Sequence, residues 1–178
     1  MTLSNMRGWT LPVSRRAFLT AGTRRLSLPA RPPWSVDEAR FVSGCTRCEA
    51  CITACPERIL VRGDGGFPEV DFRRGGCTFC GDCARACPEP LFARPGGGTA
   101  PWALRADVGE ACLGRAGVVC ELCRDACDAR ALRFVAGRRR LTAPSLDADR
   151  CTGCGACVSA CPPGALEVTV PSGATARV

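Results

Sequence analysis

Sixteen of the 178 residues are cysteines, and they fall into four sets of four. Three of the sets follow one pattern, Cys-x2-Cys-x2-Cys-x3-Cys-Pro, as in CTRCEACITACP, which starts at Cys45. This run is typical of bacterial proteins that bind [4Fe-4S] clusters. Three thiolates spaced three residues apart let one tight loop reach three irons of a cubane, while the fourth thiolate comes from elsewhere. We therefore expect ligands in these three sets, which are Cys45, Cys48, Cys51 and Cys55; Cys77, Cys80, Cys83 and Cys87; and Cys151, Cys154, Cys157 and Cys161.

The remaining set, Cys112, Cys120, Cys123 and Cys127, departs from this pattern. Seven residues, LGRAGVV, separate its first two cysteines, and Asp128 stands where the other sets have proline. We expect the chain after Cys127 to be less constrained than after the other fourth cysteines. Because the set is complete, it predicts a fourth cluster. The alternative is that Cys112 is a buried free thiol and that the third site is a three-cysteine cluster.

Zinc and disulfides are the competing interpretations of so many cysteines. All-cysteine zinc sites usually pair two Cys-x2-Cys knuckles, whereas these sets add a third cysteine three residues on. Cysteines so close together in a tight loop are poorly placed to bridge one another, and a disulfide scaffold would need an oxidising compartment. The sequence thus favours four [4Fe-4S] clusters and predicts no catalytic residue.

The segment SRRAFL, residues 14 to 19, has the paired arginines of a twin-arginine export signal. A signal also needs an apolar region of about 7 to 15 residues, and here Arg24 and Arg25 end the apolar run too early. No stretch approaches the roughly 18 apolar residues of a membrane span. We therefore expect a cytoplasmic protein without a membrane span; an uncleaved twin-arginine passenger is the alternative.

Composition excludes several function classes. The chain has no histidine, which excludes catalytic triads and histidine-based acid/base catalysis. It also contains no flavin, nicotinamide or molybdenum motif, so we do not expect an enzyme in its own right. The formal net charge is +7, but four oxidised clusters with their thiolates would add about eight negative charges. The loaded protein would then carry about −1, which does not favour nucleic acid as a partner.

The chain contains an internal repeat. Residues 59–72 and 131–147 each predict a hairpin between two cysteine sets, and residues 165–170 predict a closing strand. Each copy would run from ligand loop through short helix and hairpin to a second ligand loop and helix, in an α+β fold. The predicted organisation is a flexible basic N-terminal arm, 1–40; a first lobe, 41–94; a linker, 95–102; a second lobe, 103–170; and a tail, 171–178.

The predicted arm is strongly basic. Six arginines precede the first acidic residue, Asp37; they are Arg7, Arg15, Arg16, Arg24, Arg25 and Arg31. We expect Arg15 and Arg16 to dock on an acidic surface of a partner protein. The alternative is a solvated tail without a partner.

Each predicted lobe resembles a two-cluster bacterial ferredoxin, with the fold and pseudo-twofold symmetry of that family. In such ferredoxins the fourth cysteine of each run binds the other cluster. The resemblance implies four ligand groups: Cys45, Cys48, Cys51 with Cys87; Cys77, Cys80, Cys83 with Cys55; Cys112, Cys120, Cys123 with Cys161; and Cys151, Cys154, Cys157 with Cys127. In the alternative, the outer sets pair with each other and the inner sets with each other, as in four-cluster electron-transfer subunits.

The whole chain resembles the NapF family, ferredoxin-type accessory proteins encoded with periplasmic nitrate reductases. The motifs that carry the resemblance are SRRAFL, RPPWS at 31–35, Asp37-Glu38 before the first set, the hairpin at 59–72, and the widened third set with CELCRDAC. The resemblance implies a cytoplasmic iron-sulfur protein that assists maturation of the reductase catalytic subunit, bound in its precursor form, before export. The alternative is an electron carrier or an electron-transfer subunit of a quinol-linked membrane complex.

Overall fold

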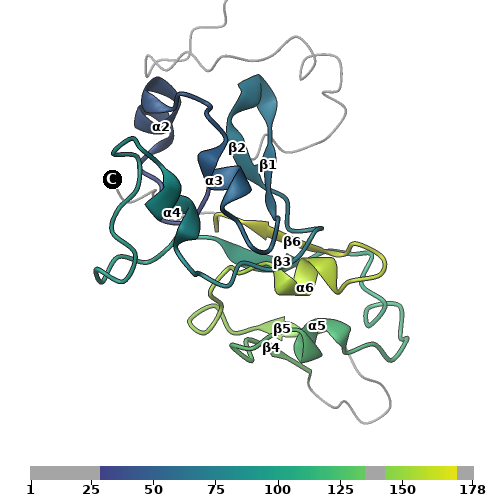
Figure 1. The fold of residues 1–178 in the computed structure, drawn as a ribbon. Coiled ribbons are helices and arrows are strands. Elements are labelled where there is room, and N and C mark those ends of the chain that lie inside the picture. Colours follow the sequence, from purple (N-terminus) through teal and green to yellow (C-terminus); the bar gives the residue numbers. More distant parts are fainter. Residues whose placement is uncertain (1–28, 135–142, 172–178) are drawn as a thin grey trace, which may run out of the picture.

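The computed structural model describes residues 29–134 and 143–171. Most of the predicted arm, including Arg15 and Arg16, lies outside the described residues. Short helices and strands are mixed along the described chain, in agreement with the α+β class (Figure 1). Among the described residues, no helix is both long enough and apolar enough to cross a membrane.

Six elements belong to the first half of the described residues. They are α2 (Glu38–Gly44), α3 (Ala50–Thr53), β1 (Leu60–Arg62), the short 3-10 helix η1 (Asp64–Gly66), β2 (Pro68–Val70) and α4 (Asp82–Ala86). The second half contains β3 (Arg105–Val108), α5 (Leu122–Asp125), β4 (Leu132–Arg133), β5 (Ser145–Leu146), α6 (Ala156–Ser159) and β6 (Leu166–Thr169). The helices α3, α4, α5 and α6 each carry the third cysteine of one set. The order of ligand loop, helix, hairpin, ligand loop and helix is therefore as predicted.

The strands of both predicted hairpins are confirmed. β1 and β2 are antiparallel, with Leu60 opposite Val70, and β4 and β5 are antiparallel, with Leu132 opposite Leu146. The turn between β4 and β5 lies outside the described residues. An equivalent hydrogen bond begins each hairpin, because the N–H of Asp71 donates to the carbonyl of Ile59 and that of Asp147 to Ala131, both at 2.8 Å.

The predicted closing strand is also present. β6 pairs antiparallel with β3, with Leu166 opposite Val108, and the N–H of Gly109 donates to the carbonyl of Ala165 at 2.7 Å. The first half has an equivalent backbone contact without a full strand pair, since the N–H of Val36 donates to the carbonyl of Leu91 at 2.9 Å. Leu91 and Ala165 both lie four residues after a fourth cysteine. The two halves thus repeat the same backbone contacts.

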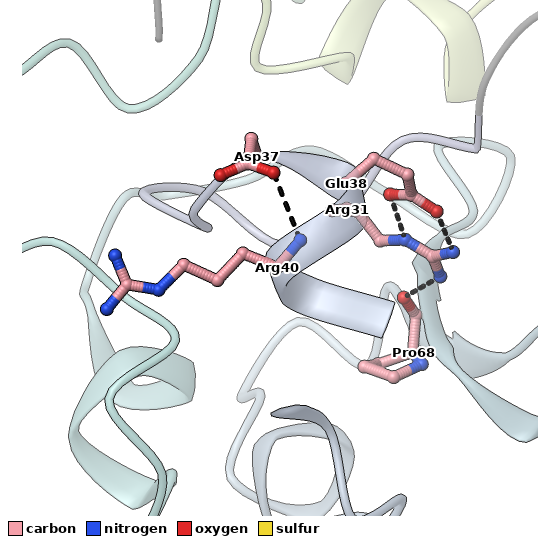
Figure 2. A network of polar contacts seen from close by, with 5 residues as sticks. All are labelled: Arg31, Asp37, Glu38, Arg40 and Pro68. Atoms are coloured by element: carbon pink, nitrogen blue, oxygen red, sulfur yellow. Dashed lines mark hydrogen bonds and ion pairs between the residues drawn. The ribbon is translucent and has the colours of Figure 1, made fainter. Parts of the chain in front are cut away.

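Residues just before α2 pack against the first hairpin. Asp37 caps α2 by accepting from the N–H of Arg40 at 3.0 Å, as an N-cap aspartate does (Figure 2). Arg31 pairs with Glu38 at 2.6 Å and donates to the carbonyl of Pro68 at 3.0 Å (Figure 2). The Arg31 side chain is only 11% exposed. This arginine, counted with the arm in the sequence, is therefore bound to the fold and not displayed to a partner.

The buried core is small and contains cysteines. The third cysteine of every set is buried, at 7 or 8% exposure: Cys51, Cys83, Cys123 and Cys157. Cys51 and Cys83 share one cluster of buried residues with Leu60, while Cys123 and Cys157 share another. A lobe of about 60 residues has a marginal apolar core, so groups bound by these cysteines would add much of the cohesion.

The predicted linker is tied to the first half of the chain. The backbone N–H of Trp34 donates to the carbonyl of Pro101 at 2.6 Å, and its indole N–H donates to Thr99 at 3.2 Å. Trp34 is itself 7% exposed. The sheet of β3 and β6, which follows the linker, lies between the elements of the first half and the α5, β4 and β5 elements in Figure 1.

Candidate functional site: four groups of cysteines

One hollow is lined by thiols from two different sets. Cys45, Cys48 and Cys51 of the first set line it together with Cys87 of the second, and the apolar lining includes Phe41. Burial raises the pKa of the Cys51 thiol to about 11, and the neighbouring Cys87 and Cys45 thiols add to the rise. These four residues are the first ligand group that the ferredoxin resemblance implies.

A second hollow has the mirrored composition. Cys77, Cys80 and Cys83 line it together with Cys55 of the first set, and Ile59 belongs to its apolar wall. Burial raises the pKa of Cys83 to about 12 and that of Cys77 to about 11. Because the thiolate is the form that binds metals, a cluster placed here would have to displace protons from these buried thiols.

The two hollows differ from a sealed core in one respect. In the first and second sets, the second cysteine is exposed and the third is buried. The exposed thiols are Cys48 and Cys80, and the buried ones are Cys51 and Cys83. Groups bound in the hollows would therefore have one edge near solvent and the opposite edge in the core.

The backbone of the three regular loops follows one path. The residues just before the second cysteine have positive φ, which is 59° at Arg47, 55° at Phe79 and 72° at Gly153. The residues just after it, Glu49, Gly81 and Gly155, also have positive φ. Alternation of left-handed residues makes a concave backbone whose N–H groups can face a bound anion. The loop backbone therefore suits a negatively charged cluster.

Backbone N–H groups also point at sulfur. Phe79 N–H donates to Cys77 Sγ at 3.4 Å. The N–H of Ala131 donates to Cys127 Sγ and that of Ala165 to Cys161 Sγ, both at 3.3 Å. Such hydrogen bonds orient a ligand and tune the metal group that it binds.

A common turn follows three of the fourth cysteines. Its third residue is left-handed in each case, with φ of 54° at Arg58, 50° at Arg130 and 62° at Gly164. The N–H of each donates back to the cysteine carbonyl, including Arg130 to Cys127 at 2.8 Å. The structure thus does not show the looser chain that we expected at Asp128, because backbone hydrogen bonding closes the turn without proline.

In the second half, thiols of the fourth set lie near two from the third. Burial raises the pKa of Cys157 to about 12, with further contributions from the thiols of Cys154 and Cys151 and, after them, of Cys127 and Cys123. Cys127 and Cys151 also pack against the buried cluster that contains Cys157. Cys127, Cys151, Cys154 and Cys157, which are among these cysteines, make up another ligand group implied by the resemblance.

The widened third set also comes together. Burial raises the pKa of Cys123 to about 11, and the Cys112 and Cys120 thiols are close enough to contribute. Cys161 packs against the buried cluster that contains both Cys123 and Cys157. Cys112 is half-buried.

The seven residues between Cys112 and Cys120 are compactly folded. Arg115 N–H donates to the Cys112 carbonyl at 2.9 Å, and Val118 N–H donates to Leu113 at 2.9 Å. The end of this seven-residue segment is nevertheless apolar and exposed, since Val118 is 50% and Val119 72% exposed. Glu121, which follows the second cysteine, has φ of −126°, whereas its counterparts in the regular loops are left-handed; in this loop the residue with positive φ is Gly117, at 79°.

The donor sets fit an iron-sulfur cluster. In the first half, four thiols from two sets line each of two hollows with apolar walls, and this arrangement suits a cubane with several irons. A bound [4Fe-4S] cluster accepts or releases one electron, while the protein fixes its position and shields its buried edge.

Two family models match the chain, and both describe iron-sulfur binding. A 4Fe-4S dicluster domain matches residues 44–90, and a 4Fe-4S binding domain matches residues 144–167. The ferredoxin-type protein NapF of Escherichia coli K12 is 44% identical over 88% of this chain and 94% of its own. The chain belongs to the NapF family of ferredoxin-type proteins. It accordingly binds [4Fe-4S] clusters.

Other relatives match at lower coverage or identity. NapF of Haemophilus influenzae is 45% identical over 78% of this chain and 77% of its own. The methylamine utilization ferredoxin-type protein MauM of Methylorubrum extorquens is 30% identical over 86% of this chain and 77% of its own. The two matching family models span the first, second and fourth cysteine sets but not the third. The irregular set thus lies outside the standard ferredoxin patterns.

Proposed function

We propose that the protein carries four [4Fe-4S] clusters in two tandem ferredoxin-like lobes, with the crossed pairing of bacterial ferredoxins. The ligand groups are Cys45, Cys48, Cys51 and Cys87; Cys77, Cys80, Cys83 and Cys55; Cys112, Cys120, Cys123 and Cys161; and Cys151, Cys154, Cys157 and Cys127. Support comes from the two hollows, each lined by three thiols of one set and the fourth of another. The dicluster match over residues 44–90 agrees with two clusters in the first lobe.

We further propose that this protein assists maturation of the catalytic subunit of a periplasmic nitrate reductase before that subunit is exported. The observation that carries this proposal is membership of the NapF family over nearly the whole chain. The protein would bind the precursor in the cytoplasm and help to install or reduce its [4Fe-4S] cluster. It would not act as an enzyme in its own right.

A binding experiment with the two forms of the reductase tests this role. The loaded protein, immobilised under anaerobic conditions, should retain the precursor, which still has its export signal, and should retain little of the mature subunit. Equal retention of both forms would contradict a role before export. A fusion of residues 1–40 to a reporter that works only in the periplasm should give no signal, and a signal would contradict cytoplasmic residence.

An electron carrier is the second candidate function. The exposed cysteines Cys48 and Cys80 favour it, because they place one edge of two cluster sites near solvent, where a redox partner can approach. A carrier has no reason to prefer the precursor over the mature reductase. It should also exchange electrons rapidly with a quinol-oxidising membrane complex, which a dedicated maturation factor would not.

A further inference from the structure

A backbone hydrogen bond joins a ligand loop of the first half to a ligand loop of the second. The N–H of Cys77, the first residue of the second set, donates to the carbonyl of Cys154 at 2.8 Å. Cys154 is the second residue of the fourth set. Two loops 77 residues apart in the sequence are therefore in direct contact at their cysteines.

The surfaces around this hydrogen bond are closely packed. A Cβ added at Gly76 would lie 2.8 Å from the Cβ of Ala156 and 3.1 Å from its backbone nitrogen. A Cβ at Gly155 would fall within the ring of Phe72. Glycine at these two positions allows the backbone of one half to approach the other.

Trp102 packs against residues on both sides of this hydrogen bond. Its indole N–H donates to the carbonyl of Thr152 in the fourth set at 3.0 Å. Its ring meets those of Phe72 and Phe79 edge-on, with centroids 5.7 and 5.5 Å away. Phe79 lies inside the second ligand loop, so this one tryptophan contacts the ligand loops of both halves.

Contacts inside each half extend this connection. Cys51 and Cys83 belong to one cluster of buried residues, and Cys123 and Cys157 belong to the other. The four ligand loops are therefore connected in the order first, second, fourth and third. The connection between the halves is the one that a pair of independent two-cluster ferredoxins would lack.

We propose that Phe72, Gly76, Trp102 and Gly155, with the hydrogen bond from Cys77 to Cys154, form a junction that holds the second and fourth ligand loops in fixed register, so that the four cluster sites make one array. The inference rests on the proposed four clusters. These are positioning residues, since they act through the loops that hold the ligands. Each of these two loops packs against the other. An ordered conformation of one loop therefore stabilises the ordered conformation of its neighbour.

Two variants that alter the junction without touching a cysteine test this role. Gly76→Ala inserts a methyl group between the halves. Its matched control, Gly97→Ala, places a methyl group that meets only Arg94, within the linker. Trp102→Ala removes the shared aromatic contact, while Trp102→Phe retains a ring for Phe72 and Phe79 but not the indole N–H.

The readout is the EPR spectrum of the fully reduced protein at measured iron content. Reduced [4Fe-4S] clusters are paramagnetic, and neighbouring paramagnets broaden each other's signals. Gly76→Ala and Trp102→Ala should change this interaction at full iron content, while Gly97→Ala should not, and Trp102→Phe should restore most of the wild-type spectrum. Iron release to a chelator should be about tenfold faster in Gly76→Ala than in Gly97→Ala.

The outcomes separate this inference from the proposed function. Wild-type iron well below about sixteen atoms per chain would contradict the four clusters, and the array with them. Full iron in wild type and in Gly76→Ala, with superimposable spectra, would overturn the junction alone. If Trp102→Ala does not retain iron, the EPR spectrum of Gly76→Ala alone tests the junction, because this variant removes no side chain.

Discussion

A single methyl group added at Gly155 should strongly destabilise the protein. The φ of Gly155, 79°, is in the left-handed region, and an added Cβ would fall 1.9 Å from Cδ1 of Phe72. A left-handed non-glycine residue costs about 1–2 kcal/mol, and forcing an extra methyl group into a packed site costs about 1–3 kcal/mol more. Gly155→Ala should therefore destabilise the loaded protein by about 2–5 kcal/mol, against the roughly 5–15 kcal/mol of a typical domain.

Gly164→Ala is the matched control for the backbone contribution. Gly164 also has a positive φ, 62°, but a Cβ there would have no neighbour within 4 Å. The equivalent residues after Cys55 and Cys127 are arginines with similar φ, so the turn accepts a side chain. This variant should lose only about 1–2 kcal/mol.

The assay is loss of cluster absorbance in guanidinium under anaerobic conditions, followed as a rate because cofactor-bound proteins seldom unfold in two states. The difference of about 1–3 kcal/mol between the variants should make Gly155→Ala lose its clusters at least about fivefold faster than Gly164→Ala. In the double variant with Phe72→Ala the steric cost should disappear, so the two effects should be less than additive. Equal rates for the two glycine variants, or strict additivity with Phe72→Ala, would refute this reasoning.

Three further predictions follow from the ligand sets and the arm. Anaerobically purified protein should contain about sixteen iron and sixteen sulfide per chain by chemical analysis; about eight of each, or zinc instead, would contradict four clusters. Changing both Arg15 and Arg16 to Ala should weaken binding to the reductase precursor and reduce the dependence of that binding on salt, measured by titration at several ionic strengths; unchanged affinity would argue against electrostatic docking. The cluster held by Cys112, Cys120, Cys123 and Cys161 should be lost first to a chelator or oxygen, because its loop is longer and Glu121 does not take the left-handed φ of its counterparts; a fastest phase of iron loss that persists in Cys120→Ala and vanishes in Cys48→Ala would place the labile site in the first lobe.

Features set by local spacing could be predicted from the sequence. Cysteines three residues apart define a ligand loop whatever surrounds them, which is why the four sets could be identified without a structure. The two hairpins were also predictable, because alternating apolar residues around a turn encode a local pairing between strands such as β1 and β2. The repeat followed from these two signals, and the equivalent hydrogen bonds of Asp71 and Asp147 agree with it.

Features that depend on distant contacts required the tertiary structure. The partner strand of β6, Arg105–Val108, carries no strong strand pattern of its own and forms because Leu166 and its neighbours pair with it. Arg31 looked like one more arginine of a basic arm until Glu38 and the Pro68 carbonyl were seen to bind it. Arg47, Glu49 and Phe79 adopt positive φ although their residue type predicts none, because the ligand loop dictates the backbone there.

Contact between the two halves was the least predictable feature. The sequence suggested a linker at residues 95–102, and composition alone gave Trp102 no role. Trp102 contacts both halves because Gly76, Gly155 and Phe72, far apart in the chain, leave surfaces that match only after each ligand loop has folded. Local spacing thus determined the four cysteine sets and the two hairpins, whereas packing between segments distant in sequence decided how the cysteine loops lie against one another.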